Sequence, residues 1–481
     1  MNKAKLAAIE AIKKNAGEFY ALSDEIWHYA ELSLKEYKSA DAYCRVLEQL
    51  GFSVQKELCG IKTAFSGSFG SGKPVIGILG EFDALSGLSQ VGGIAERQEL
   101  VPGGSGHGCG HNMLGAGALA AAYGIKKYLE DTGREGTVIL FGTPGEEGGA
   151  GKAFMAKEGL WYGLDCALTW HPEDVNEVAT GTCNSCIQTL YCFKGVAAHA
   201  AGDPEDGRSA LDAVELMNVG VQYLREHTKS DARIHYAMID GGGASPNVVQ
   251  PHASVLYMVR SIAVADALAL QARVDKIADG AAMMTETTYE RVFIDGCSNT
   301  VPNHALERLL YKNYSELGVA EYTEEEKQYA AALKATYPDH GTLPGIAAKL
   351  DSAAAETVKK LSDGGRAPLN DFLCPLWDGY VFGPGSTDVG DVSWQTPTAQ
   401  LHAVCFPSGA PGHSWQNVAC GVTSIGHKGL LTAGCVLAAA AIDLYEDPAL
   451  LEEAAAEFKV AAAAGYTCPI PPDEYAKAVE I

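Results

Sequence analysis

Three short apolar runs, each followed at once by polar residues, constrain most strongly what this chain can fold into. The runs cover residues 74–80, 137–142 and 166–170, and the polar residues Asp83, Glu146 and His171 come directly after them. An alanine-rich helical pattern over residues 112–130 separates the first two runs. Strands alternating with helices are typical of an α/β sheet, in which ligands gather at the carboxyl ends of the strands. The sequence therefore predicts an α/β fold with its functional site at that edge.

The pattern changes near residue 187, and with 481 residues the chain is long enough for a second domain or an insertion. The expected elements there are strands at 187–193, 232–239, 253–262 and 289–294, and helices at 207–228 and 264–285. The order strand-helix-strand-strand-helix-strand describes a compact α+β insert. We therefore expect a catalytic domain in two parts, residues 1–186 and 299–481, and an inserted domain at 187–298.

Residues 104–112, Gly-Ser-Gly-His-Gly-Cys-Gly-His-Asn, form a glycine-rich loop that holds Cys109 and His111 two positions apart. Cysteine and histidine are ligands that first-row metals prefer, and the glycines let the backbone fold tightly enough for side chains to converge. The alternative is a flexible loop that happens to hold a thiol and two imidazoles. Adding Glu147, His171 and His413 gives about the number of ligands that a two-metal site needs, with one group shared. His107 is left out of this set.

The pair Glu146-Glu147 follows an apolar strand, and its two carboxylates point in different directions. One is suited to hold a metal while the other stays free as a general base for a metal-bound water. Asp83 is suited to orient a metal ligand through a hydrogen bond without binding the metal itself. The alternative for the pair is a solvated acidic loop.

The expected insert carries three further candidate residues, His199, Asn247 and Arg260. Arg260 ends an expected strand, and its guanidinium is suited to grip a carboxylate with two hydrogen bonds. The alternative for each of the three is a surface or structural role.

Composition excludes several kinds of partner. The formal net charge of −24 argues against nucleic acid and anionic membrane surfaces, which need a basic face. Thirteen cysteines without a short-loop framework favour a reduced setting, and the amphipathic N-terminal stretch has no secretory pattern, so we expect a cytoplasmic protein.

The apolar helical run at 430–442 is expected to be buried and too short to span a bilayer. Residues 67–74 nearly match a phosphate-binding loop, but Pro74 replaces the hydroxyl residue, so we expect a hairpin turn there.

Taken together, these motifs resemble a known superfamily. They are Gly-His-Gly-Cys-Gly-His-Asn, Pro-Gly-Glu-Glu-Gly-Gly, Trp-His-Pro, Lys-Gly-Val-Ala-Ala-His-Ala-Ala, Asn-Val-Val-Gln-Pro and a late Gly-His-Ser. The chain resembles the metal-dependent amidohydrolases that include aminoacylases, hippurate hydrolases and carboxypeptidases. It is most similar to the branch named for aminobenzoyl-glutamate utilisation protein B.

The resemblance implies a phosphorylase/hydrolase-like α/β catalytic domain with a mixed sheet, plus an inserted α+β ferredoxin-like lid or dimerisation domain. It implies two divalent ions, Zn²⁺ or Mn²⁺, and assigns their ligands as Cys109, His111, Glu147, His171 and His413. Glu146 would act as general base and then general acid, supported by Asp83.

The resemblance also implies how substrate is bound. His199 would reach into a partner's active site and stabilise the oxyanion, while Asn247 and Arg260 would bind the substrate carboxylate. The substrate would be a small N-acyl amino acid, such as a p-aminobenzoyl-glutamate-like compound, or a dipeptide. The lid would form a homodimer, with a hetero-oligomer as the other arrangement.

Two other functions stay open at this point. One is an amidase in which Cys109 is the nucleophile and a nearby histidine its base. The other is an accessory subunit of a hetero-oligomeric amidohydrolase.

The chain also departs from many relatives in four places. It has Asn112 where they have aspartate and Glu81 where they have histidine, while residues 86–105 and 321–380 look longer and are expected to shape the pocket or a subunit contact.

Overall fold

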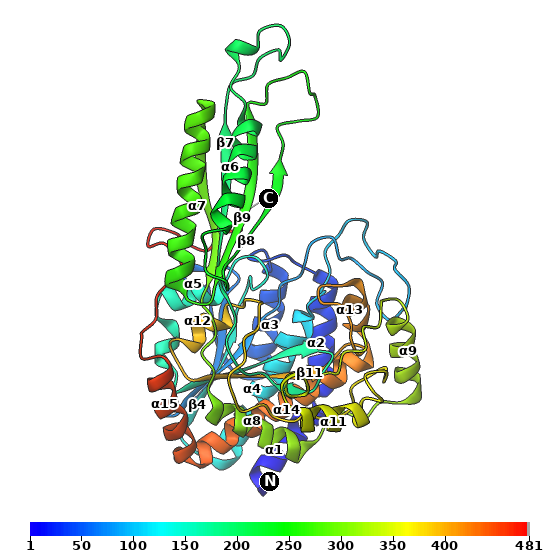
Figure 1. Ribbon diagram of the computed structural model, residues 1–481. Helices are drawn as coiled ribbons and strands as arrows, with labels where there is room; N and C mark the ends of the chain where they lie inside the picture. The colour runs from blue at the N-terminus through cyan, green and yellow to red at the C-terminus, as the bar shows by residue number, and fades with distance from the viewer. Residues whose placement is uncertain (479–481) are drawn as a thin grey trace.

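The computed structural model describes residues 1–478. It consists of a broad body, built on a seven-stranded sheet, and an elongated four-stranded unit that stands on it (Figure 1). We call this second unit, from Ser185 to Cys297, the lid. Its ends lie beside the expected boundaries at 187 and 298. The expected fold class, an α/β domain with a mixed sheet and an α+β insert, is confirmed.

The sheet of the body is mixed, with the strand order β1-β2-β4-β3-β5-β11-β6. The central strands β4, β3, β5 and β11 run parallel, whereas β1, β2 and β6 are antiparallel to their neighbours. The strands are β1 (Ser53–Lys56), β2 (Phe65–Ser71), β3 (Val75–Gly80), β4 (Gly136–Gly142), β5 (Cys166–Glu173), β6 (Glu177–Val178) and β11 (Thr398–Val404). Because four strands are parallel, their carboxyl ends meet at one edge.

Helices cover both faces of this sheet. The helices of the body are α1 (Lys3–Lys14), α2 (Ala16–Tyr29), α3 (Tyr37–Gln49), α4 (His111–Thr132), α5 (Gly151–Lys157), α8 (His304–Leu317), α9 (Glu324–Lys334), α10 (Ile346–Leu350), α11 (Ser352–Leu361), α12 (Val389–Ser393), α13 (Trp415–Cys420), α14 (Ser424–Glu446) and α15 (Pro448–Ala461), with short 3₁₀ turns at Leu58–Gly60 and Leu160–Gly163. Successive strand residues point to opposite faces, so Val138 and Leu140 face the α4 side while Phe141 faces α5 and its neighbours.

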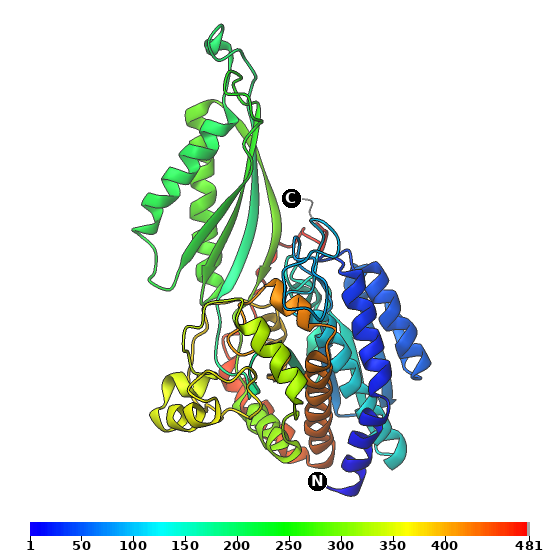
Figure 2. The ribbon, with the colours of Figure 1, turned by 90° about the vertical axis from the view of Figure 1, so that its right-hand side faces the viewer.

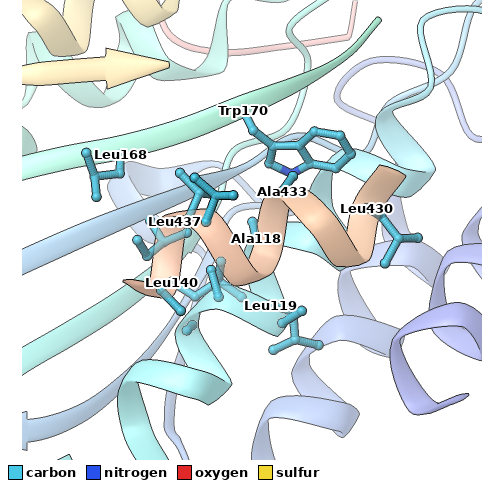
Figure 3. Packing of buried hydrophobic residues seen from close by; sticks show 14 of the residues in the cluster. Ala118, Leu119, Leu140, Leu168, Trp170, Leu430, Ala433 and Leu437 are labelled. Atoms are coloured by element: carbon cyan, nitrogen blue, oxygen red, sulfur yellow. The ribbon is translucent and has the colours of Figure 1, made fainter. Parts of the chain in front are cut away.

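The larger core lies between the sheet and the helices α4 and α14. Figure 3 shows these side chains together, among them Ala118, Leu119, Leu140, Leu168, Trp170, Leu430, Ala433 and Leu437. The two helices approach closely because α14 has Gly434 at their contact, where a Cβ would lie 2.8 Å from the Cβ of Ala120. With 23 residues, α14 is long enough to span a membrane, contrary to the expected shorter helix, but 78% of its most apolar stretch is buried, as expected.

The lid sheet has the order β10-β7-β9-β8, with every neighbouring pair antiparallel. Its elements are β7 (Ser185–Lys194), a 3₁₀ turn at Pro204–Asp206, α6 (Ala210–Arg225), β8 (Arg233–Asp240), β9 (His252–Ser261), α7 (Val264–Thr285) and β10 (Thr288–Cys297). In chain order the strands are arranged 4-1-3-2, as in the ferredoxin-like fold. Helices α6 and α7 cover one face of this sheet, and the loops after β7 and between β8 and β9 form the tip farthest from the body (Figures 1 and 2).

Three local expectations were wrong. Residues 67–74 do not form a hairpin, because β4 lies between β2 and β3 and pairs with both. His171 lies inside β5 instead of after it, because pairing with β11 extends the strand to Glu173. The segment 383–412 contains one strand, β11, and the short helix α12 instead of several short strands.

Replacing Leu437 by alanine should destabilise the body, because this fully buried side chain fills the contact between α14 and the sheet. We expect a loss of about 2–5 kcal/mol in the free energy of unfolding. Leu6→Ala is the control, since Leu6 is 44% exposed on α1 and should cost less than about 0.5 kcal/mol. Urea unfolding followed by tryptophan fluorescence measures both, and equal midpoints for the two variants would contradict this packing.

Candidate metal centre

Segments far apart in the chain meet at the carboxyl edge of the body's sheet. β4 leads to Glu147, β5 carries His171 close to its end, and His413 lies in the loop between β11 and α13. Cys109 and His111 come from the loop that starts α4. The structure therefore brings the five expected ligands to one place.

The distances within this cluster suit metal binding. Cys109 Sγ lies 3.3 Å from His171 Nε2, and His413 Nε2 lies 3.5 Å from Glu147 Oε2. Ligand atoms of Cys109, His111 and His171 lie within 4.8 Å of one another, as do those of Cys109, Glu147 and His413. A cavity of about 290 Å³ opens beside them.

Two buried atoms in the cluster, His111 Nε2 and Glu147 Oε1, make no hydrogen bond in the described part of the chain, although Glu81 Oε2 lies 3.3 Å from His111 Nε2. Buried polar atoms are almost always paired in folded proteins, so unpaired ones need an explanation. An imidazole nitrogen and a carboxylate oxygen are both common ligands of divalent ions. The residues present therefore fit a metal.

The electrostatics of the cluster favour cations. Burial alone would raise the pKa of the Cys109 thiol, but two neighbouring imidazoles bring this pKa well below its usual value. Burial and repulsion from Cys109 raise the pKa of Glu147 to about 8. Burial and the charges of Glu81 and Glu147 raise the pKa of Glu146 well above its usual value. A positive ion among these groups would reduce their mutual repulsion.

Asp83 orients His111. Asp83 Oδ1 accepts a hydrogen bond of 3.0 Å from His111 Nδ1, so Nε2 faces the cluster and would offer its lone pair to a metal ion. Asp83 Oδ2 accepts from Ser33 Oγ at 2.7 Å and from the backbone N–H of Glu147 at 2.9 Å. Burial opposes ionisation, yet these contacts lower the pKa of Asp83 to about 2. Asp83 therefore stays charged and links two of the expected ligands.

The backbone at two positions is shaped to place the ligands. Gly110 has φ +83° directly before α4, and a Cβ there would lie 2.9 Å from the side chains of Met113 and Phe406. His413 has φ +51°, a left-handed conformation that is uncommon for residues other than glycine. Such strained residues cluster at functional sites, where the surrounding structure holds them.

The sequence did not reveal a buried charged trio behind the cluster. Lys152 Nζ lies 2.8 Å from Glu81 Oε1 and 2.6 Å from Asp388 Oδ1, and all three side chains are almost completely buried. Glu81 also lies 3.3 Å from His111 Nε2 and forms a third potential ligand group with His111 and Glu146. The position of Glu81 directly after β3 could have indicated a site residue in the sequence. No pattern in the sequence indicates that Lys152 is buried.

The structure shows the surroundings of Asn112, of His107 and of the excursion 86–105. Asn112 Nδ2 donates hydrogen bonds of 3.0 Å to Ser23 Oγ and to the carbonyl of Gly421, the second of which an aspartate could not make. His107, left out of the ligand set, faces the carbonyl of Ile26 through Nε2. The excursion 86–105 is closed at its base by pairing of Leu85 with Gly106.

The lid residues divide into two groups. His199 and Asn247 are exposed on the two loops at the tip, and within residues 1–478 one chain does not bring them to the metal cluster. Arg260 lies at the base of the lid, where its Nη1 donates a 2.8 Å hydrogen bond to Ser386 Oγ. Ser386 lines the cavity beside the metal cluster. The roles of all three residues stay predictions.

Known proteins are similar to this chain over most of its length. The family model for peptidase family M20/M25/M40 matches residues 78–367. The chain is 44% identical over 467 residues to the B subunit of the p-aminobenzoyl-glutamate hydrolase of Escherichia coli (strain K12), covering 96% of each chain. It is 27% identical over 470 residues to the Xaa-Arg dipeptidase of Mus musculus, covering 95% of this chain and 92% of that protein.

A solved structure has the same fold. The Bacillus subtilis YXEP protein, a dinuclear metal binding peptidase from the M20 family, matches with a TM-score of 0.53 and 16% sequence identity, covering 90% of this chain and 99% of that one. The resemblance expected from the motifs is thereby confirmed. The family model spans more than half of the chain and the Escherichia coli relative spans nearly all of it, so the chain belongs to peptidase family M20/M25/M40 and is a hydrolase of amide bonds.

Proposed function

We propose that this protein is a two-metal amidohydrolase that cleaves a small N-acyl amino acid of the p-aminobenzoyl-glutamate kind. The observation that carries the proposal is the convergence of metal-type ligands and Glu146 at one cavity, where four of the five ligands line the cavity and the fully buried His111 lies next to Cys109 and His171. The 44% identical relative named for p-aminobenzoyl-glutamate supports this substrate class. An N-acyl amino acid has one amide bond to cleave and one free carboxylate to hold.

Each group in the cavity has a distinct task in this proposal. Cys109, His111, Glu147, His171 and His413 would hold two divalent ions, Zn²⁺ or Mn²⁺. When bound, such ions supply Lewis acidity that polarises a carbonyl and acidifies water. Glu146 lines the same cavity, takes a proton from the attacking water and returns it to the leaving amine.

His199 would complete the site from a second copy of the chain. Its Nδ1 accepts hydrogen bonds from the backbone N–H groups of Ala201 and Gly202, so its proton lies on Nε2, which has no partner within residues 1–478. A free N–H is suited to stabilise an oxyanion. Asn247 lies on the neighbouring tip loop and would bind the substrate carboxylate with Arg260.

The lid offers a surface for a second copy. Strand β8 is an edge of its sheet and exposes Tyr236, Met238 and Ile239, and the adjoining helix α6 exposes Tyr223. Exposed apolar edge strands favour pairing with another chain. We propose a homodimer through this face. A hetero-oligomer, in which this chain has an accessory role, is the second arrangement, because the 44% identical relative is by its name one subunit of a hydrolase.

Metal removal tests the centre. We expect chelation to abolish hydrolysis of p-aminobenzoyl-glutamate, and added Mn²⁺ or Zn²⁺ to restore it, because the ligand cluster has no other source of Lewis acidity. Metal analysis of the active protein should give about two ions per chain. Full activity after complete stripping, together with loss of activity on thiol alkylation, would instead favour Cys109 as a nucleophile with His171, 3.3 Å away, as its base.

Two neighbouring substitutions separate proton transfer from metal binding. Glu146→Gln should keep the metal content while lowering kcat by at least about 100-fold, because the amide cannot accept a proton. Glu147→Gln is the matched control and should lose metal, because its Oε1 and Oε2 face His111 and His413. A normal rate for Glu146→Gln would remove Glu146 from this role.

Mixing two inactive variants tests whether His199 acts across the dimer. His199→Ala and Glu146→Gln should each be inactive, but after unfolding and refolding together, mixed dimers contain one intact site. We expect about a quarter of wild-type activity, since half the dimers are mixed and each has one working site of two. No recovery from dimers of confirmed mixed composition would contradict action in trans.

A further inference from the structure

A second cavity, of about 580 Å³, lies where the base of the lid meets the body. The strands β8 and β9 form its lid side, with Arg233, His235, Met258 and Arg260. Phe382, Pro384 and Gly385 form its body side. Neither Arg233 nor His235 takes part in the proposed reaction.

Strand register places the two arginines side by side. Arg233 of β8 pairs directly with Arg260 of β9, and His235 pairs with Met258. Ile234 and Val259 lie between these positions and are buried against the lid helices, so the two arginines share the opposite face of the sheet. Like charges directly opposite one another on neighbouring strands are destabilising unless an anion lies between them.

Within residues 1–478 the protein places two acidic groups near the arginines, Asp231 in the cavity lining and the buried Asp295, which interacts with the charge of Arg260. Neither Arg233 nor Arg260 forms an ion pair there, and Asp231, the one acidic residue that lines the cavity, accepts hydrogen bonds from Ser261 Oγ and the backbone N–H of Ile262 instead. Within the described part of the chain, Arg233 donates through Nη1 alone, to the carbonyls of Ser230 and Ala232. The other N–H groups of its guanidinium are therefore free to bind a ligand.

His235 lies near three arginine side chains. Burial lowers the pKa of His235, and the charges of Arg260, Arg225 and Arg233 lower it further. A neutral His235 can donate one hydrogen bond to an anion without adding charge. Arg233 and His235 are exposed, and the half-buried apolar side chains of Met258 and Phe382 line the cavity beside them.

The cavity adjoins the metal centre. Pro384 and Gly385 line the basic cavity, while the next residue, Ser386, lines the metal cavity. Arg260 donates to Ser386 Oγ at 2.8 Å and therefore lies between the two cavities. A substrate whose amide lies at the metal centre and whose α-carboxylate meets Arg260 would direct its amino-acid side chain into the basic cavity.

We infer that Arg233, with His235, forms a subsite for a second carboxylate, so that the protein selects amides of dicarboxylic amino acids over those of neutral ones. This inference rests on the proposed function, in which Arg260 holds the α-carboxylate. In addition to that function, the subsite would recognise the negative charge on the amino-acid side chain of the substrate, and Arg233 and His235 of β8 would form it.

Two nearly isosteric substrates measure this recognition. The wild-type protein loaded with Mn²⁺ should hydrolyse p-aminobenzoyl-glutamate with a kcat/KM about 10- to 100-fold above that for p-aminobenzoyl-glutamine, since hydrogen bonds to charged groups have this strength. Arg233→Gln should lose most of this factor on the glutamate compound while the glutamine compound is little affected.

Two further variants separate charge from structure. Arg233→Lys keeps the positive charge and should keep most of the preference for the glutamate compound, although it loses the two hydrogen bonds that Arg233 Nη1 donates to backbone carbonyls. Arg273→Gln is the matched control, because Arg273 is exposed on α7, away from the basic cavity, and donates to the carbonyl of His227. Equal wild-type rates on the two substrates, or an equal loss on both in Arg233→Gln, would overturn the subsite.

Equilibrium binding keeps this test independent of turnover. The Glu146→Gln protein loaded with Mn²⁺ should bind p-aminobenzoyl-glutamate more tightly than p-aminobenzoyl-glutamine by calorimetry, and adding Arg233→Gln should remove the difference. If the wild-type protein did not hydrolyse either compound but the difference in affinity remained, the proposed reaction would be rejected and the subsite would not. Equal affinity for the two compounds would reject the subsite even in an active enzyme.

Discussion

The rest of the structure depends on the concentration of buried acidic groups at the carboxyl edge of the parallel strands. Glu81, Glu146 and Glu147 converge there with the Cys109 thiol. Burying a charge is costly unless it is paired, and among residues 1–478 Lys152 forms ion pairs with Glu81 and Asp388 alone, behind the cluster. Glu146 and Glu147 therefore have no lysine or arginine partner within residues 1–478. Divalent ions are the partners that its ligand types and unpaired atoms fit.

The parallel strands explain why the ligands could be found in the sequence. Each of Asp83, Glu147 and His171 lies beside the end of a strand whose apolar run is visible in the sequence, and the glycine-rich loop marks Cys109 and His111. Parallel pairing then brings these ends together, whatever the intervening loops do. The lid was predictable for a similar reason, since its alternation of strands and helices is a local pattern.

The features that were missed depend on contacts between distant parts of the chain. Asp388 accepts a hydrogen bond from the backbone N–H of Lys152, 236 residues away in sequence. The insertion of β4 between β2 and β3 likewise depends on pairing that no local pattern specifies. A buried lysine also contradicts its usual exposed location, so only the folded structure reveals its partners.

Like charges are brought together twice in this molecule, as acids in the body and as arginines in the lid. Each arrangement disfavours the ligand-free fold, and each is complementary to one part of the proposed reaction, a pair of cations or a dicarboxylate. A ligand that binds only the folded state stabilises it. The metal cavity and the basic cavity are separated by one segment, residues 384–387, which lines both. A dicarboxylic substrate that spans the two cavities would therefore offset the repulsion on the lid side with its own charge, while the ions offset it on the body side. In this arrangement the lid determines which amide is held and the body determines how it is cleaved.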